Sequence, residues 1–520
     1  MTAKVIVCEP YFSGSHRAWA EGLAAHSAHE VRLVTHDGGF WKWRMQGAAL
    51  TLAEDIRRLV ADWGPPDLLV ASDMVHLPAL LGFARDVLVG VPVVVYFHEN
   101  QMTYPVPEGV APDETYAMTN WLSMAVADRV VFNSEYHRAD VLAAVPRLLR
   151  RLPDHRHTPS LDAVVARTSV LPVGIDATRF AGPRSWGGDV VRRAPVDGPV
   201  SRDNGPAGDG RRPPDPVDGP ANRHDGLPGD DRRAPVDGPA DRGSGPPGDG
   251  RRPPDPVGTP GELPGETRRV PVVLWNHRWE YDKDPAAFFG ALRAVADAGV
   301  DFELIVAGES YQTEPAEFAR ARSAFADRIV WFGTASDEQY PDLLRRADVV
   351  VSTARHEFFG VAVVEAITAG ALPVLPRRLS YPELVPDPSD TYLYADTPAD
   401  PAATVAGAGR ADRPSADTPA DPAATVEGAG RVDRPSDGSA DSAADRAADE
   451  PGPADREAGA SGGAGLVDML TWALTDHAGR RTAAAVARKH VEQFAWAQVA
   501  PRYDALFSEA MANVRPSPRQ

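Results

Sequence analysis

Short apolar runs alternate with helical patterns along residues 1–180 and again along residues 268–394. In the first segment, the runs that predict β-strands are Val5–Cys8, Val31–Thr35, Leu68–Ala71, Val93–Phe97, Arg129–Phe132 and Ser169–Val173. In the second segment they are Val272–Trp275, Glu303–Ala307, Ile329–Phe332, Val349–Ser352 and Pro373–Leu375. Strands that alternate with helices are typical of doubly wound parallel sheets. We therefore predict an α/β protein with two Rossmann-like halves, followed by helices alone over residues 465–510.

Two stretches, 181–267 and 395–464, interrupt this rhythm. They are rich in Pro, Gly, Ala, Asp and Arg. In the first stretch the segment RRAPVDGP begins at Arg192 and occurs again at Arg232. No repeat has an apolar face that could stack on its neighbour, so burial cannot offset the entropy lost on ordering. We predict two disordered insertions. The predicted map is an N-terminal domain at 1–180, an insertion at 181–267, a second domain at 268–394, an insertion at 395–464 and C-terminal helices at 465–520.

Charge and composition narrow the class of protein. The net charge is −19, of which −11 lies in the two stretches, so the foldable part lacks a general nucleic-acid signature but leaves room for a local basic patch. A single cysteine, Cys8, excludes a disulfide framework and favours a reducing compartment. The longest apolar run, Val87–Phe97, is broken by Gly90 and Pro92 and is too short to span a bilayer. Because Glu9 interrupts the first apolar run, no signal peptide is evident. We expect a cytoplasmic protein without a membrane partner; its oligomeric state stays open.

The first predicted strand leads into a turn that could approach a ligand. The segment EPYFSGSH ends at His16 and precedes a helix. Gly14 suits a tight turn with close backbone approach, and a helix N-terminus favours an anion or a polar ligand group. His16 would then lie at the mouth of a cleft; the alternative is a polar residue that only caps the helix.

A second group of polar residues follows the strand Val93–Phe97. These residues are His98, Glu99, Asn100 and Gln101. A buried strand that ends in polar residues places them at the carboxyl edge of the sheet, where ligands bind in this architecture. A solvated polar loop is the alternative interpretation.

In the second half, Arg278 and Lys283 lie on a loop between a strand and a helix. Two cations at such a junction suit a diphosphate, although a solvated charged loop would look the same. The segment from Asp282 to Asp284 formally matches the Asp-x-Asp pattern of metal–nucleotide sites. Lys283 between the acids and Arg278 nearby make phosphate the better ligand, so we expect no metal requirement.

Two glutamates, Glu357 and Glu365, flank a predicted helix start at Gly360. The backbone N–H groups around Gly360 and Val361 can hold a phosphate. One carboxylate can then face a sugar and the other a ribose diol.

These residues resemble a known family. The two glutamates, with Arg278 and Lys283 upstream, resemble the Glu-x7-Glu pattern and basic pair of retaining GT-B glycosyltransferases. Longer segments look like the tRNA-queuosine α-mannosyltransferase family: Gly14–His16, Trp41–Arg44, His98–Gln101, Phe132–Ser134, Asn276–Glu280 and His356–Val361. The resemblance spans nearly all of both halves. The two insertions depart from the family pattern, but both fall where loops are expected.

The resemblance implies a GT-B fold, with two domains facing each other across a cleft. It implies transfer of mannose from GDP-mannose to the cyclopentene-diol of queuosine in tRNA, with retention of configuration and no covalent intermediate on a side chain. By the same resemblance, Arg278 and Lys283 would neutralise the leaving diphosphate and Glu365 would hold the ribose. Glu357 would hold the transferred sugar, and His98 would orient sugar or acceptor hydroxyls.

A tRNA acceptor requires phosphate contacts. Lys42 and Arg44 stand beside Trp41 and Trp43, which mixes cations with rings that can stack on bases, unless the tryptophans are ordinary packing residues. The run Arg147–Arg156 is a second basic patch or a solvated face. The residues expected at the acceptor are Gly14, His16, Trp41, Lys42, Trp43, Arg44, Glu99, Asn100 and Asn133.

Two other functions fit parts of the sequence. A GT-B enzyme acting on a small molecule, lipid head group or glycan suits the modest charge of the folded part. A non-catalytic nucleotide-sugar-binding scaffold would make the repeats its working part, but the intact basic pair and glutamates argue against it.

Overall fold

The computed structural model describes residues 2–105, 113–182, 269–308, 314–395 and 465–512. The predicted insertions at 181–267 and 395–464 lie almost wholly outside these residues, so their disorder stays a prediction. The division into domains also stays a prediction.

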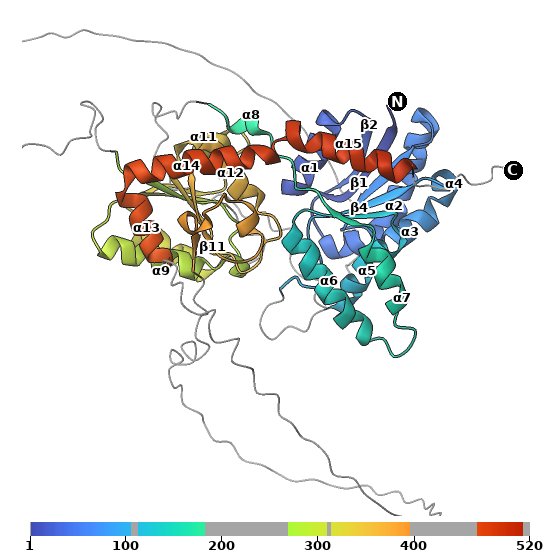
Figure 1. Cartoon of the computed structure of the whole chain (residues 1–520), viewed down its shortest axis with the longest axis horizontal. Coiled ribbons are helices and arrows are strands. Elements are labelled where there is room, and N and C mark those ends of the chain that lie inside the picture. The colour runs from blue at the N-terminus through green and yellow to red at the C-terminus, as the bar shows by residue number, and fades with distance from the viewer. Residues whose placement is uncertain (1, 106–112, 183–268, 309–313, 396–464, 513–520) are drawn as a thin grey trace, which may run out of the picture. The chain divides into compact units, whose positions relative to one another are not determined.

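The first half contains a six-stranded parallel sheet in the order β2-β1-β3-β4-β5-β6 (Figure 1). Its strands are β1 (Lys4–Phe12), β2 (Glu30–Asp37), β3 (Leu68–Ser72), β4 (Val93–Phe97), β5 (Arg129–Phe132) and β6 (Thr168–Val170). Both faces are covered, since Val5 and Val7 enter one apolar cluster while Ile6 and Cys8 enter another. This burial explains why the strands read as continuous apolar runs.

Helices connect these strands. They are α1 (Gly14–His26), α2 (Trp41–Trp63), α3 (Leu77–Phe83), α4 (Arg85–Leu88), α5 (Glu114–Val126), α6 (Glu135–Arg150), α7 (Thr158–Val165) and α8 (Ala177–Phe180). Side chains start several of them: Ser134 caps α6 by accepting the N–H of His137, and Asp113 caps α5 through Thr115.

The second half repeats the architecture, with a parallel sheet in the order β12-β11-β10-β7-β8-β9. Its strands are β7 (Val272–Trp275), β8 (Glu303–Ala307), β9 (Ile329–Gly333), β10 (Val349–Val351), β11 (Leu372–Pro376) and β12 (Leu393–Tyr394). Its helices are α9 (Pro285–Asp297), α10 (Ala316–Ala324), α11 (Gln339–Arg346) and α12 (Val361–Ala369), with a 3-10 turn η1 at Tyr281–Lys283. The predicted α/β class with two Rossmann-like parallel sheets is confirmed.

Some strand boundaries differ from the prediction. β1 continues to Phe12 because β2 pairs with it that far, and β12 was not predicted because two residues give no periodic signal. β6 ends at Val170, so the predicted stretch up to Val173 leaves the sheet early.

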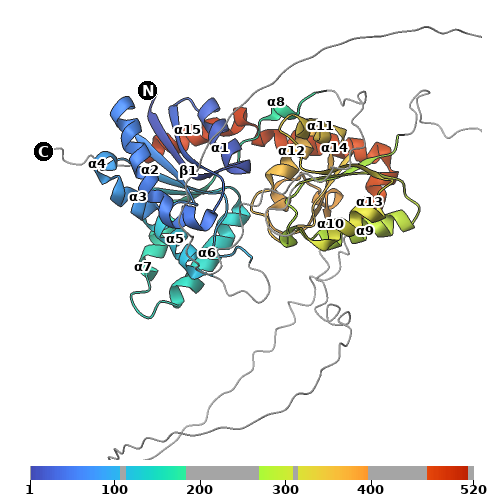
Figure 2. The same cartoon turned by 180° about the vertical axis from the view of Figure 1, so that it is seen from behind.

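Three C-terminal helices of the described chain are drawn in red in Figure 2. They are α13 (Leu466–Thr475), α14 (His477–Val491) and α15 (Trp496–Ala512). Two of them contact β11 of the second sheet, and the third contacts β3 and β4 of the first. α13 and α14 pack on α9, α12 and β11, whereas α15 packs on α1 of the first half. Trp19 donates a hydrogen bond to the Tyr503 hydroxyl at 3.0 Å, and Ser27 donates one to Asp504 at 2.6 Å.

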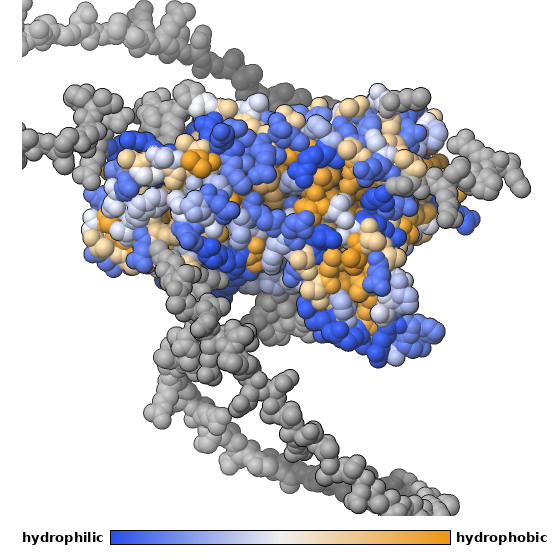
Figure 3. Space-filling view, in the orientation of Figure 1, coloured by the Kyte–Doolittle hydropathy of each residue, from blue (hydrophilic) through white to orange (hydrophobic). Residues whose placement is uncertain are grey.

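Exposed hydrophobic residues do not form one continuous region on the face shown in Figure 3; they lie in separate groups among hydrophilic ones. No helix in the described part of the chain is long and apolar enough to cross a membrane.

The packing of α15 on α1 predicts a glycine requirement. A Cβ at Gly22 would overlap the indole of Trp496, whereas a Cβ at Gly82 in α3 meets no atom within 4 Å. Gly22→Ala should destabilise the protein by about 1–3 kcal/mol because the core there is already filled. Gly82→Ala should be neutral or stabilising, by about 0.5–1 kcal/mol. Urea unfolding of the two variants measures both; equal stability of the two would contradict the docking of α15.

Candidate active site

Polar side chains gather at the carboxyl edge of the first sheet. Asp73 follows β3, His98 follows β4 and Asn133 follows β5. Because these strands are parallel, their ends meet at one edge. Glu9, near the end of β1, and His16, in the first turn of α1, complete the group.

Glu9 and His16 form a buried ion pair. The Glu9 side chain is fully buried; its Oε1 accepts the Tyr11 N–H at 2.8 Å, and its Oε2 lies 3.0 Å from His16 Nδ1. Burial alone would lower the pKa of His16. The carboxylate of Glu9, with Asp73 and Glu99 farther away, outweighs burial and raises the pKa of His16 to about 9. At neutral pH His16 is therefore a cation.

The His98 ring packs against this pair, and hydrogen bonds to its backbone N–H and carbonyl fix its position. Its ring centroid is 4.1 Å from that of His16, and its Nε2 is 4.0 Å from Glu9 Oε2. The His98 N–H donates to Asp73 Oδ1, and its carbonyl accepts from Asn133 Nδ2, each at 2.8 Å. Burial, together with the His16 cation, lowers the pKa of His98 well below its usual value. His98 is therefore a fixed, neutral imidazole.

The other predicted acceptor residues of this loop are placed differently. Asn100 is buried, and its Oδ1 accepts the N–H groups of Met102 and Thr103, so its side chain shapes the loop. Glu99 is half-buried and accepts from Gln101 Nε2 at 3.1 Å. Gly14 has a φ of +50°, and no atom lies within 4 Å of where its Cβ would be, which leaves its backbone approachable.

In the second half, Lys283 is the centre of a buried charge cluster. Its Nζ lies 3.3 Å from Glu357 Oε2 and 3.3 Å from Asp282 Oδ2, and donates to the His356 carbonyl at 2.8 Å. Burial would raise the pKa of Glu357, but the Lys283 cation and the histidines 277 and 356 outweigh it and hold that pKa below the usual value. Glu357 is therefore a carboxylate next to an ammonium group.

Glu365 sits in a different environment, inside α12. Its Oε2 accepts from the Tyr340 hydroxyl at 2.9 Å, and Asn276 donates both to that hydroxyl and to the Ala362 carbonyl. Burial raises the pKa of Glu365 to about 7, against the opposing effect of Tyr340. The two glutamates thus differ in charge state around neutral pH.

The start of α12 offers unpaired backbone donors between these glutamates. Gly360 is the N-cap, with a φ of +94° and no side-chain hydrogen bond to the helix. The first N–H groups of a helix, here from Val361, have no intrahelical partner and attract anions. Arg278 lies five residues before Lys283, and its side chain is exposed. It donates a hydrogen bond to the Tyr104 hydroxyl at 3.2 Å.

Contacts link Asn133, which holds His98, to the loop that carries Glu357. Ser134 donates to the Phe358 carbonyl at 2.6 Å, and the His137 ring stacks on Phe358 with centroids 4.0 Å apart. Asn133, which holds His98, also hydrogen-bonds His137 at 2.8 Å. The residues next to Glu357 and His98 are thus linked by direct contacts.

One cluster among the described residues has the composition of a metal site. Glu9, His16 and His98 offer atoms that all lie within 4.8 Å of one another. The 3.0 Å Glu9–His16 hydrogen bond already explains their approach. In the Asp-x-Asp segment the acids face different partners: Asp282 faces Lys283, while Asp284 caps α9 and pairs with Arg355. The expected lack of a metal requirement stays a prediction.

Comparison with known families decides the class of this site. Residues 4–175 match the model described as tRNA-queuosine alpha-mannosyltransferase N-terminal, and residues 265–407 match glycosyl transferases group 1. Both matches confirm the resemblance of the chain to the tRNA-queuosine α-mannosyltransferase family. It is a glycosyltransferase, as the resemblance of its motifs implied.

Relatives of this glycosyltransferase agree. A tRNA-queuosine alpha-mannosyltransferase of Drosophila melanogaster is 28% identical over 383 residues, which cover 74% of this chain and 81% of the relative. A GDP-mannose:cellobiosyl-diphosphopolyprenol alpha-mannosyltransferase of Xanthomonas oryzae is 30% identical over 120 residues, 23% of this chain and 30% of that one.

Solved structures confirm the GT-B fold. Sucrose-phosphate synthase of Thermosynechococcus elongatus aligns with a TM-score of 0.54 and 15% identity, covering 98% of this chain and 99% of that one. HepE of Anabaena, in complex with UDP and glucose, aligns with a TM-score of 0.52 and 13% identity over 97% and 99% of the two chains.

Sequence reasoning missed Glu9, Asp73 and Tyr340. Glu9 lies inside a strand rather than after one, and its only signal was a carboxylate that interrupts an apolar run. Asp73 directly follows a buried strand, the same signal that identified His98, and could have been found. Tyr340 gave no signal, because only the fold brings it to Glu365.

The Glu9–His16 pair of this glycosyltransferase predicts a pH-dependent stability. The pKa of His16 is about 9 in the folded protein and about 6.5 in the unfolded chain. Because the folded protein binds the His16 proton more tightly than the unfolded chain does, protonated His16 contributes its full stabilisation below pH 6.5. This contribution is lost as the pH rises towards 9. We expect up to about 3 kcal/mol of stability to disappear across that window, because each pKa unit corresponds to about 1.4 kcal/mol.

Urea unfolding at several pH values measures this loss. Glu9→Gln and His16→Asn should flatten the dependence between pH 6.5 and 9, whereas His155→Asn, at an exposed histidine, should keep it. An unchanged slope in Glu9→Gln would show that the pair does not carry the charge assigned to it.

Proposed function

We propose that this glycosyltransferase transfers mannose from GDP-mannose to the cyclopentene-diol of queuosine in tRNA, with retention of the α configuration. The observation that carries the acceptor is the match of residues 4–175 to the queuosine-specific family model, because that segment contains Glu9, His16 and His98. The Drosophila relative of the same name supports the same acceptor. Relatives named for GDP-mannose support the donor.

The donor would bind at the start of α12. Its diphosphate carries charge that the free N–H groups at Gly360 and Val361, Arg278 and Lys283 can neutralise. Lys283 donates to the His356 carbonyl and to Glu357 Oε2, and its third N–H bond is left for a phosphate oxygen. Arg278 is exposed and can contribute further donors.

The transferred sugar would lie between Glu357 and His98. Positive charge grows on the anomeric carbon as the bond to the diphosphate breaks, and the Glu357 carboxylate can stabilise it. In a retaining reaction without a covalent intermediate, the acceptor hydroxyl attacks from the face that the diphosphate leaves, and the departing phosphate accepts its proton. His98 would orient the sugar or acceptor hydroxyls through a hydrogen bond, because it is neutral and held on both sides.

A direct test uses tRNA that contains queuosine, with GDP-mannose, UDP-glucose and other nucleotide sugars as donors. Mass analysis of the digested nucleosides should find a hexose on queuosine only with GDP-mannose, and none on tRNA that lacks queuosine. Transfer to a lipid or glycan acceptor without transfer to tRNA would instead support the small-acceptor alternative.

The two glutamates should fail in different ways. Glu357→Gln removes a charge that matters most in the transition state, so kcat should fall by about 100-fold, or about 2.7 kcal/mol, with little change in donor KM. Glu365→Gln should mainly raise the donor KM, because a ribose contact contributes equally before and during reaction. Steady-state kinetics of both variants decide this; near-normal kcat in Glu357→Gln would remove Glu357 from the reaction.

A further inference from the structure

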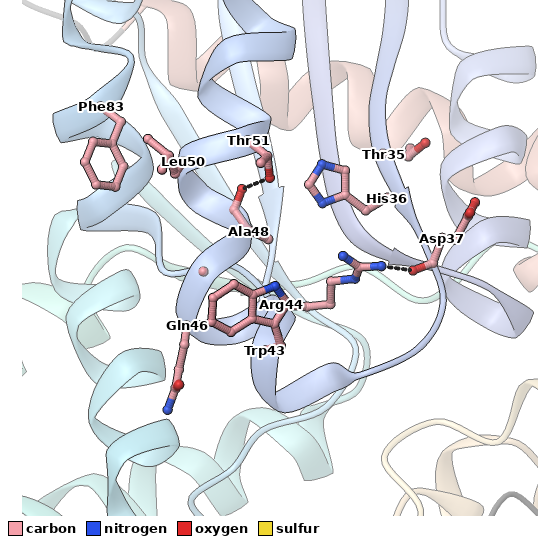
Figure 4. Close-up of a pocket in the computed structure, with 11 residues that line it drawn as sticks. Thr35, His36, Asp37, Trp43, Arg44, Gln46, Ala48, Leu50, Thr51 and Phe83 are labelled. Atoms are coloured by element: carbon pink, nitrogen blue, oxygen red, sulfur yellow. Dashed lines mark hydrogen bonds between the residues drawn. The ribbon is translucent and has the colours of Figure 1, made fainter. Parts of the chain in front are cut away.

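A groove opens beside the edge of the first sheet, away from the donor residues. It has a volume of about 700 Å³ and lies between the end of β2 and the first turns of α2 (Figure 4). Trp43, Arg44, His36, Leu50 and Phe83 line it. The predicted acceptor residues Trp43 and Arg44 thus face this groove rather than the core.

The indole of Trp43 packs against the helix backbone on one side and is exposed to solvent on the other. It rests on Gly47, where a Cβ would come within 2.8 Å of the ring, so the helix backbone supports the ring from one side. The side chain is nevertheless 63% exposed, and Leu50 and Phe83 beside it are 50% and 47% exposed. A rigid, exposed aromatic ring with apolar neighbours is a surface that a flat ligand can cover.

A cation, Arg44, lines the same groove. Arg44 donates to the Asp37 carbonyl at 3.2 Å, as Figure 4 shows, but its Nε is buried with no hydrogen-bond partner. The Nδ1 atom of His36 is buried and unpartnered as well. Because both atoms are closed off from solvent, the groove offers a ligand the charge of the Arg44 guanidinium rather than these atoms. Lys42, exposed on the first turn of α2, does not line the groove, since its Nζ lies 5.6 Å from the centroid of the Trp41 ring.

The groove is coupled to the candidate active site through the same helical turn. Trp41 packs against Tyr116, and Trp41 and Tyr11 both pack against the cluster of Met45, Met74 and Tyr116. Tyr11 donates the backbone hydrogen bond to Glu9. In addition, Thr35 of the groove is the register partner of Glu9 on neighbouring strands. The groove therefore borders the strand that pairs with the one carrying Glu9.

We propose that this groove binds an unpaired nucleotide of the RNA acceptor next to the modified one, with its base stacked on Trp43 and its phosphate near Arg44. This inference rests on the proposed tRNA acceptor. It adds the position of the nucleotide that neighbours the modified one along the RNA strand. Single-stranded RNA is recognised by stacking of bases on aromatic rings combined with cations for the backbone. The groove provides both, in Trp43 and Arg44.

The test uses an anticodon stem-loop RNA that contains queuosine, and compares four proteins: the wild type, Trp43→Ala, Trp43→Phe and Val89→Ala. Val89 is 82% exposed and lies away from the groove, so its variant controls for loss of exposed apolar surface. Equilibrium binding of the RNA and of GDP is measured for each, with steady-state mannose transfer and urea unfolding.

Trp43→Ala should weaken RNA binding and raise the RNA KM by about 10-fold to 100-fold, the effect usual for one lost stacked base. Affinity for GDP and stability should not change. Trp43→Phe should recover most of the binding, and Val89→Ala all of it. If the wild type transfers mannose to the RNA and Trp43→Ala binds the RNA as tightly as the wild type does, the groove assignment is wrong but the proposed function stands. If the wild type transfers nothing to the RNA, the proposed function fails, and this inference fails with it.

Discussion

The parallel register of the first sheet is the constraint on which the candidate site depends. Phe97 of β4 and Phe132 of β5 are paired residues, so the residues that follow them, His98 and Asn133, emerge side by side. That is why the Asn133 amide can reach the His98 carbonyl at 2.8 Å. The same register pairs Glu9 with Thr35 and so places the buried ion pair next to the groove beside α2. A slip of one residue would turn these side chains to the opposite face of the sheet.

In each half a buried charge is stabilised by a partner of opposite charge. The result is a neutral imidazole in the first half and a carboxylate in the second. In the first half the Glu9 carboxylate keeps His16 protonated, and the resulting cation helps to keep His98 neutral. In the second half Lys283 keeps Glu357 ionised. Since a buried charge left without its partner is strongly destabilising, both pairs must form when the chain folds. The protein therefore presents one neutral imidazole and one carboxylate before any ligand arrives.

Much of this could be predicted from sequence because the relevant signals are local. A buried strand that ends in polar residues identified His98, and the spacing of Glu357 and Glu365 around Gly360 identified the start of α12. Glu9 could not be assigned in this way, since a carboxylate inside a strand has no meaning until His16 is brought to it by the turn at Gly14. The partners of Asn100 could not be predicted either, because its contacts lie within a loop whose conformation has no periodicity.

The pair Trp41 and Trp43 shows why orientation needs the structure. Two residues apart on a helix, they point about 200° away from each other around its axis, so they cannot share one surface. Sequence alone left open whether they pack or bind, and each alternative is correct for one of them: Trp41 packs against Tyr116, and Trp43 is exposed over Gly47. Trp41 therefore belongs to the same small cluster as Tyr11, whose N–H donates to one oxygen of Glu9, while Trp43 on the same turn lines the groove.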